Sequence, residues 1–504
     1  MKPVLYAFAV LAIGCAPHID PGPIPVEQRN TLHVLAQPDD ASPNIYLQAL
    51  VRAGSATDPV GREGVAHLVA QSLVDAGAGD RSSVEVRDAL YVTGNRITVG
   101  VDREWVRIRL RCHRDHADLC IELFSDALLS PRFDEGDVFR LRDDATYSVE
   151  QGLMSNEEAL GHEVLESVLF QSHPYGHPPR GRSGVLPLLT VDHLRQFHAS
   201  HYVRETVYAG IGGGFTAEQH KAFEARLGVL KGQAAPELIL LQPQPVSERS
   251  LTLVETQTLV TGIHFGHPIA VDRNDPDWWP LTLGMTALGQ HRQSFGRLFR
   301  TLRTDRGLNY GTYSYIEPYV QRGWSSLPEN GVVRSHPYFY VWIRPTSTEN
   351  GPFALKLAID ETESLIQEGL TESEFERTRD YLLGWVPLLA QDPGRRLAFA
   401  LESAATGTPN LLEALPDAFE GIDAARVQQA LQDHIDLDRV QIVAVTGEAE
   451  AFANAVIEES ATPIVYSDVQ PDAEQAKRDE RVAQQPLNIP NPAMWRVQAQ
   501  GIFR

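Results

Sequence analysis

Cysteine and positive charge are both scarce in this sequence. Three cysteines in 504 residues exclude a disulfide-dense scaffold and a zinc ribbon built from several cysteines. The 44 lysines and arginines are outnumbered by 66 aspartates and glutamates, which gives a formal net charge of −22. This balance argues against nucleic acid as the main partner, because phosphate binding needs clustered basic residues.

Long apolar runs are also missing. No segment reaches about 18 unbroken apolar residues, so we expect no transmembrane helix. What is present is ordinary globular composition, with 43% hydrophobic and 22% charged residues. The length allows about two to four domains, each able to bury a core of its own.

The amino terminus has the pattern of a secretory signal. Lys2 is followed by an apolar run over residues 4–13, which at about ten residues is too short to span a bilayer. The sequence Ala12-Ile13-Gly14-Cys15 resembles the bacterial lipobox, in which the cysteine is lipidated. We therefore predict a signal peptide over residues 1–14 and a lipid on Cys15. The alternative is a buried apolar strand with an incidental cysteine.

Residues 15–29 are rich in proline and suit a tether that holds a domain away from a membrane. No aspartate follows Cys15, and by resemblance to enterobacterial sorting this favours the outer membrane. The prediction is a lipoprotein on the periplasmic side of a bacterial membrane, which it contacts through the lipid alone.

Cys112 and Cys120 lie in the segment CHRDHADLC, together with His113 and His116. Two cysteines in an oxidising compartment can pair, whereas their spacing with the histidines imitates a metal site. The residues before this segment alternate as a strand does and those after it have helical periodicity. Ligands on both sides of such a junction would need a fortunate geometry. A disulfide and two unpaired thiols both stay open, and a metal site is disfavoured.

Strand-like and helix-like segments alternate along the chain in an order that repeats. Residues 229–248, rich in proline and glutamine, separate the two repeats and are typical of a linker. We predict an α+β fold with two homologous domains, residues 30–228 and 249–470, each an antiparallel or mixed sheet flanked by helices. Residues 471–504 are polar, and we expect them to form an arm over the surface.

Five segments stand out in this sequence: Val51–Ser55, Gly64–Leu68, His173–Gly181, Leu189–Val203 and Ser294–Tyr315. Together they resemble the insulinase and pitrilysin family, the inverted zincins that include mitochondrial processing peptidase. The resemblance covers nearly all of residues 31–468. It implies a clam-like pair of domains in each subunit, with two subunits closing around a chamber that admits extended peptides.

The zinc motif of that family, H-x-x-E-H, is degenerate here and begins at His67. The motif works because two histidines one helical turn apart bind one zinc ion, and the glutamate between them activates its water. In this chain the glutamate position holds Ala70, which cannot act as a base, and the second histidine position holds Gln71, a poor ligand.

The resemblance implies a downstream glutamate as the third ligand. Glu163 is the best-placed candidate, and Glu157 or Glu158 are alternatives. One histidine and one glutamate do not hold zinc. We therefore predict no metal in this chain, a structural role for His67, and no peptide hydrolysis by the chain alone.

Arg303 and Tyr310 stand seven residues apart in LRTDRGLNY, the spacing of an arginine and tyrosine pair in this family. The resemblance implies that Arg303 binds a substrate carbonyl and that Tyr310 donates its hydroxyl to the developing oxyanion. Both side chains suit these roles chemically. Arg306 fits the spacing less well. The alternative is a segment kept for folding, with Gly307 at a turn and Tyr310 in the core.

In heterodimeric members of the family, one subunit carries zinc and the other supplies the arginine and tyrosine. The prediction is accordingly a non-catalytic, substrate-binding subunit without a cofactor of its own, paired with a zinc-bearing relative. We expect bound peptides to add a strand to a sheet edge. The alternative is a catalytically dead scaffold, like the core proteins of respiratory cytochrome bc complexes. A lone peptidase with an altered metal site is least favoured.

Overall fold

Two β-sheets with the same strand order organise the chain. The computed structural model describes residues 32–319, 329–457, 460–467, 470–490 and 494–504. In the first half (residues 32–228) the sheet order is β1-β5-β2-β4-β3, and in the second half (residues 249–467) it is β6-β10-β7-β9-β8, with β11 added beyond β6. The strands are β1 (His33–Pro38), β2 (Asn44–Val51), β3 (Thr98–Val101), β4 (Val106–His113), β5 (Val207–Gly213), β6 (Ser250–Glu255), β7 (Val260–Pro268), β8 (Thr312–Tyr315), β9 (Tyr338–Ser347), β10 (Gln441–Thr446) and β11 (Met494–Gln498).

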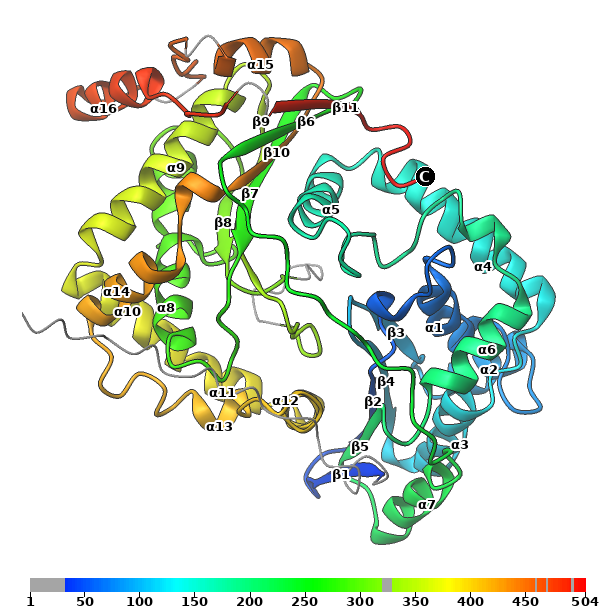
Figure 1. Cartoon of the computed structure of the whole chain (residues 1–504). Coiled ribbons are helices and arrows are strands. Elements are labelled where there is room, and N and C mark those ends of the chain that lie inside the picture. Colours follow the sequence, from blue (N-terminus) through cyan, green and yellow to red (C-terminus); the bar gives the residue numbers. More distant parts are fainter. Residues whose placement is uncertain (1–31, 320–328, 458–459, 468–469, 491–493) are drawn as a thin grey trace, which may run out of the picture.

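Helices cover the outer faces of both sheets (Figure 1). The first half has α1 (Val65–Asp75), α2 (Ser83–Tyr91), α3 (Ala117–Leu129), α4 (Glu135–Tyr147), α5 (Glu157–Leu169), α6 (Val191–His201) and α7 (Ala217–Leu227). The second half has α8 (Trp278–Gly289), α9 (Gly351–Glu368), α10 (Glu372–Leu383), α11 (Trp385–Ala390), α12 (Pro393–Thr406), α13 (Leu411–Ala414), α14 (Ala424–His434) and α15 (Ala449–Ile457). The prediction of an α+β fold built from two homologous halves is confirmed.

Local sequence signals account for individual elements. The apolar positions of α1 fall on one side, as their helical spacing predicts, and Val65, Leu68 and Leu73 are buried there. Thr371 caps α10 and Glu374 returns the hydrogen bond, which confirms the capping box expected from the sequence. Among the described residues, no helix combines the length and apolar character that a membrane span requires.

Each half contributes one helix that packs on the sheet of the other half. Helix α5 of the first half packs on β7 and β10 of the second sheet, and α12 of the second half packs on β1, β2 and β5 of the first. Glycines allow the close approach: a Cβ on Gly161 of α5 would lie 2.7 Å from the His264 ring, and one on Gly210 of β5 would lie 2.7 Å from Leu397 of α12. The hydrophobic core of the first half therefore continues onto the second sheet.

Buried charges link the halves where α5 meets the second sheet. Arg334, which precedes β9, donates to both oxygens of Asp102 at 2.8 Å and to Glu166 of α5 at 2.6 Å. Glu166 also accepts from Arg103 and from the hydroxyl of Tyr338. Burial alone would raise the pKa of Glu166, but Arg103 and Arg334 outweigh it and hold the pKa well below its usual range. This network consists of charges that are each paired, as buried charges must be.

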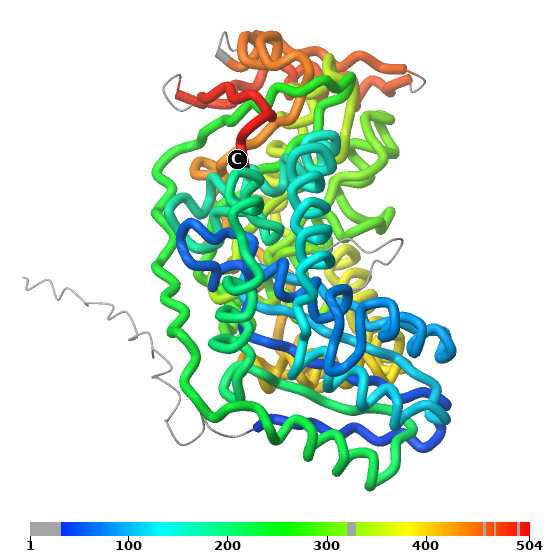
Figure 2. Tube along the Cα trace, turned by 90° about the vertical axis from the view of Figure 1, so that its right-hand side faces the viewer, coloured from blue at the N-terminus to red at the C-terminus, as the bar shows by residue number. Residues whose placement is uncertain are grey.

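The chain crosses twice between the halves outside these helices. Residues 231–247 have no regular secondary structure and run along one side of the molecule, in green in Figure 2. Leu238 and Leu240 of this stretch pack against the core of the first half. The second crossing is the C-terminal segment, described over residues 470–490 and 494–504.

The C-terminal segment does more than the surface arm expected from its polar sequence. Its helix α16 (Ala473–Gln484) packs on α9, and Val482 is fully buried in the second core. Strand β11 then pairs with β6 in parallel. Phe503 finally reaches the first half, where it is 2% exposed and its carbonyl accepts from the Ser183 amide at 2.9 Å. The segment is therefore more than an arm over the surface, because it adds a strand to the second sheet and contacts both halves.

Candidate functional site

The degenerate zinc motif lies on α1 and begins close to that helix's N-terminus. Asp58 caps this end, accepting from the Gly64 amide at 2.7 Å and from the Ala66 amide at 2.8 Å. His67 follows on the first turn and is half-buried. Burial, and after it the positive charge of Arg180, lowers the pKa of His67 to about 3, so the imidazole is neutral at physiological pH.

The next two motif positions offer no replacement for the missing ligands. Ala70 is fully buried in the core. Gln71, a neutral amide, lines a cavity of about 410 Å³ between α1, α2 and β3, which we call the Gln71 cavity. Its walls are mixed: Val74, Val86 and Val99 line it together with polar and charged side chains that include Asp75 and Arg87.

The three glutamates proposed as the third ligand all lie on α5 and serve the contact between the halves. Glu163 accepts from Arg103 at 2.8 Å, and Glu158 accepts from Arg344 of β9 at 2.6 Å. Glu157 lies against Gly262 of β7. Within the residues that the structure describes, no three histidine, cysteine, aspartate or glutamate side chains gather into a group that could hold a metal ion. The residues present therefore do not fit the family's zinc.

The structure places Arg303 and Tyr310 in contact. A π-helical segment, Phe299–Thr304, is followed by a turn in which Gly307 has a φ of +65°. Arg303 lies over the Tyr310 ring at 4.2 Å and donates to the Tyr310 carbonyl at 2.8 Å. Arg344 lies 5.3 Å from the same ring, so two guanidinium groups hold the tyrosine in place.

Exposure separates the two readings of this segment. The Tyr310 side chain is 50% exposed and so is not packed in the core, whereas Gly307 does occupy a turn that favours glycine. Arg303 is half-buried, and Arg306 is only 3% exposed. Of the two arginines, it is Arg303 that lies beside the tyrosine and in reach of a ligand.

Arg306 instead holds the turn to the C-terminal segment. It donates to Asp479 of α16 at 2.8 Å and to the carbonyl of Thr301 at 2.8 Å. Gln475 of α16 donates to the carbonyl of Asp305 at 2.8 Å. These supports were not predicted, because nothing in the polar C-terminal sequence indicates which distant turn it contacts.

Replacing Asp479 with alanine is expected to lower the free energy of unfolding by about 3 kcal/mol, since it leaves the Arg306 guanidinium buried without its carboxylate. Urea denaturation of the full chain measures this. Glu480→Ala is the matched control, because Glu480 is exposed on the same helix and its loss is expected to cost less than about 0.5 kcal/mol. Equal stability of the two variants would contradict the assignment of Asp479 as a buried support.

Two cavities meet at β3, the edge strand of the first sheet. One is the Gln71 cavity on the helix-covered face. The other, of about 970 Å³, opens on the opposite face towards α12, and we call it the arginine cavity because Arg96, Arg109, Arg111 and Arg395 line it. Thr98 of β3 belongs to both walls. One cavity therefore lies on each face of this edge strand.

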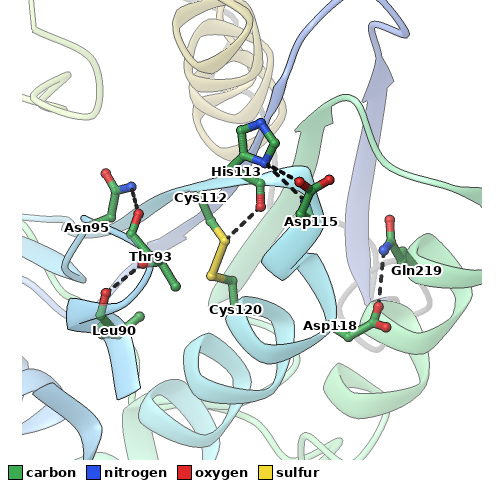
Figure 3. Close-up of a disulfide and its surroundings, with 9 residues drawn as sticks. All are labelled: Leu90, Thr93, Asn95, Cys112, His113, Asp115, Asp118, Cys120 and Gln219. Carbon is green, nitrogen blue, oxygen red and sulfur yellow. Dashed lines mark hydrogen bonds and ion pairs between the residues drawn. A yellow bond between two sulfur atoms is a disulfide. The ribbon is translucent and has the colours of Figure 1, made fainter. Parts of the chain in front are cut away.

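Cys112 and Cys120 form a disulfide that joins β4 to α3 (Figure 3). Their Cα atoms are 6.6 Å apart and both side chains are fully buried. The metal-site alternative therefore has no free thiolate, and His113 pairs with Asp115 at 3.3 Å. The predicted lipid anchor, Cys15, lies outside the described residues.

Reduction of this disulfide is expected to lower the free energy of unfolding by about 2–3 kcal/mol, the entropy of a loop closed by cysteines eight residues apart. Urea denaturation with and without reductant measures the loss. A Cys112→Ser, Cys120→Ser double variant is the control, and its stability should not respond to reductant. A wild-type chain equally insensitive to reductant, with both thiols titratable, would show that the bond does not form.

Comparison with known proteins relates this chain to a peptidase family. Residues 33–181 match the family described as insulinase (peptidase family M16), and residues 188–382 match the peptidase M16 inactive domain. An uncharacterized zinc protease of Streptomyces coelicolor is 24% identical over 68% of this chain and 71% of its own length. A Helicobacter pylori relative named as a non-peptidase homolog is 21% identical over 82% of this chain and 92% of its own.

Among solved structures, a peptidase M16 inactive domain from Pseudomonas fluorescens superimposes with a TM-score of 0.72 at 22% identity, over 82% of this chain and 94% of that one. The fold is therefore shared over most of both molecules. The two family matches follow each other along the chain and run from β1 to α10, while β10 and β11 of the second sheet lie beyond them. With this fold and these matches, the chain belongs to the insulinase family, peptidase family M16.

Proposed function

We propose that this chain is the non-catalytic, substrate-binding subunit of a heterodimeric insulinase-family zinc metallopeptidase, and that it supplies Arg303 and Tyr310 in trans. The observation that carries the proposal is the contrast between the two motifs. The zinc motif holds Ala70 and Gln71 and its candidate glutamates are engaged elsewhere, whereas Tyr310 is half exposed and held by two arginines.

The chemistry of the pair fits peptide hydrolysis carried out by a partner. A guanidinium presents several N–H donors in a fixed fork, which suits Arg303 to bind a substrate carbonyl. The hydroxyl of Tyr310 donates a hydrogen bond to the oxygen that becomes negative as the carbonyl is attacked, which lowers the barrier because the charge develops only then. The metal and its water come from the zinc-bearing relative in this proposal.

An extended peptide is the ligand that the first sheet suits best. The edge of β3 presents backbone groups that a peptide strand can pair with, and the side chains of such a strand point alternately to its two faces. The arginine cavity and the Gln71 cavity lie on these two faces. Binding through the backbone gives affinity with little sequence preference.

For location, we propose a lipoprotein anchored through Cys15 on the periplasmic side of the outer membrane. The support is the signal-like sequence of residues 1–14 and the buried disulfide, which suits an oxidising compartment. Metabolic labelling with a fatty acid tests this: wild type should incorporate label and Cys15→Ser should not, whereas equal labelling of both would contradict it.

The rival function is a scaffold that binds no peptide. The Helicobacter relative, which is named as a non-peptidase homolog, supports this alternative. The purified chain decides between them by fluorescence anisotropy with labelled unstructured peptides, followed by mass spectrometry of the same samples. We expect saturable binding with every peptide intact and no stoichiometric zinc. The absence of binding would favour the scaffold, and cleavage that a chelator stops would show an active peptidase.

A further inference from the structure

Strand β4 sets a row of arginines on the inner face of the first sheet. Its side chains alternate, so that Ile108, Leu110 and Cys112 enter the core while the arginines between and before them face the other way. These arginines, spaced two residues apart, are Arg107, Arg109 and Arg111. The inner face is the one that the arginine cavity occupies.

Two of these arginines are already neutralised. Arg109 pairs with Glu329 at 2.5 Å, and Arg107 lies 3.6 Å from the same carboxylate. The carbonyl of Asn330 accepts from both guanidiniums, at 3.0 Å from Arg107 and 3.3 Å from Arg109. The Glu329 carboxylate therefore lies within ion-pairing distance of both guanidinium groups.

The other arginines of the cavity lack such partners. Arg96 precedes β3, Arg111 lies on β4 and Arg395 lies on α12, and none of the three has a carboxylate within ion-pairing distance in the described part of the chain. Asp392, the remaining acidic side chain of the wall, caps α12 by accepting from the Arg395 amide at 2.7 Å. A chain of net charge −22 thus keeps a local excess of positive charge in a cavity of about 970 Å³.

We propose that the arginine cavity binds an acidic segment of an extended peptide, whose carboxylates pair with Arg96, Arg111 and Arg395 while its backbone joins the edge of β3. This inference rests on the proposed peptide-binding function and names the class of peptide. Charged partners in a partly enclosed cavity interact more strongly than on an open surface, because water screens them less.

The two cavities also favour a particular alternation of side chains along that peptide. Residues of a β-strand alternate between faces, so every second side chain meets the arginines and the others meet the Gln71 cavity. The apolar part of the Gln71 cavity is formed by Val74, Val86, Leu90 and Val99, and the rest of its lining is polar or charged. The favoured segment therefore alternates acidic with apolar residues. A longer polyanion such as nucleic acid suits the site less, because the rest of this acidic chain repels it.

Fluorescence anisotropy with the full chain tests this, using labelled peptides of equal length that alternate valine with glutamate, with serine or with lysine. We expect the glutamate peptide to bind about tenfold more tightly than the lysine peptide and to lose most of this advantage at about 1 M salt. A labelled oligothymidylate is the polyanion probe and is expected to bind more weakly than the glutamate peptide.

Variants then locate the site. Arg96→Gln, Arg111→Gln and Arg395→Gln change at least partly exposed side chains, and each is expected to weaken binding of the glutamate peptide about 2- to 5-fold without changing binding of the serine peptide. Arg195→Gln removes the same charge from an exposed position on α6 and should change neither. Circular dichroism of each variant confirms that the fold is intact.

The outcomes separate the two claims. If no peptide binds, the proposed function itself fails. If peptides bind without preference for acidic residues, or if the three variants bind the glutamate peptide as wild type does, this inference is wrong while the proposed function stands. Oligothymidylate binding as tight as that of the glutamate peptide would replace the peptide with a general polyanion and equally overturn it.

Discussion

Replacing Tyr310 with phenylalanine is expected to lower peptide hydrolysis by the reconstituted pair of subunits by about 10²- to 10³-fold, the loss measured when one oxyanion donor is removed. The change deletes only the hydroxyl. The ring keeps its place between Arg303 and Arg344, at 4.2 and 5.3 Å from their guanidinium carbons. Fold and peptide binding are therefore expected to persist, and the loss should appear in kcat.

Arg303→Ala is expected to act on the same step with a different signature. It removes the donor to the substrate carbonyl and the cation over the Tyr310 ring together, so both KM and kcat should worsen. The measurement is kcat/KM of the mixed subunits under conditions where all of the zinc-bearing subunit is bound. Tyr147→Phe, on an exposed tyrosine of α4, is the control for losing a hydroxyl elsewhere.

Full activity with both Arg303→Ala and Tyr310→Phe would contradict the role in trans. The segment would then be retained for folding, a reading that the turn at Gly307 and the buried Arg306–Asp479 pair also support. That result would favour the scaffold function.

Removing the carboxylate of Glu166 is expected to have the largest effect on stability of any single substitution considered for this chain. Glu166→Ala leaves Arg103 and Arg334 buried with fewer partners, each of them at most 6% exposed, and also removes the acceptor of the Tyr338 hydroxyl. We expect a loss of about 3–5 kcal/mol in the free energy of unfolding. Urea denaturation measures it, and Glu376→Ala on the exposed face of α10 is the control.

A graded variant keeps this test informative if Glu166→Ala does not fold. Among the described residues, Glu163 forms an ion pair with Arg103 alone, and it is partly exposed, so Glu163→Gln is expected to cost about 1 kcal/mol. The pH dependence gives a second readout. The pKa of Glu166 is depressed in the folded chain, so its contribution is full above its ordinary value of 4.5 and is lost as the pH falls towards the folded value. A wild-type stability that does not decline in acid relative to Glu166→Gln would contradict the assignment.

The sequence predicts the elements well where the signal is local. Alternation in VRIRLRCH predicts β4, helical spacing predicts the buried side of α1, and Thr371 with Glu374 predicts the start of α10. The repeat of these patterns predicts two homologous halves, because each half has to bury the same kind of faces.

What the sequence does not predict depends on contacts far apart along the chain. Nothing local to α5 or α12 shows that each helix packs on the sheet of the other half. The ion-pair partners of Glu158 and Glu163 cannot be predicted locally for the same reason, since Arg344 lies 186 residues from Glu158. The polar composition of α16 likewise conceals the narrow apolar stripe by which Val482 enters the core.

Net charge is a poor guide to a local site in this chain. A formal charge of −22 describes the surface as a whole, yet alternation along β4 gathers arginines on one face of one strand. The arginine cavity becomes visible only when β3, β4 and α12 are placed together.

Hydrolysis of an unstructured peptide, measured with the chain alone, with a zinc-bearing relative from the same organism alone, and with the two mixed, tests the central claim most directly. The account predicts no hydrolysis by this chain, little by the relative, and chelator-sensitive hydrolysis by the mixture that saturates at one chain of each. Hydrolysis by this chain alone, or a mixture no more active than the zinc-bearing relative, would contradict it.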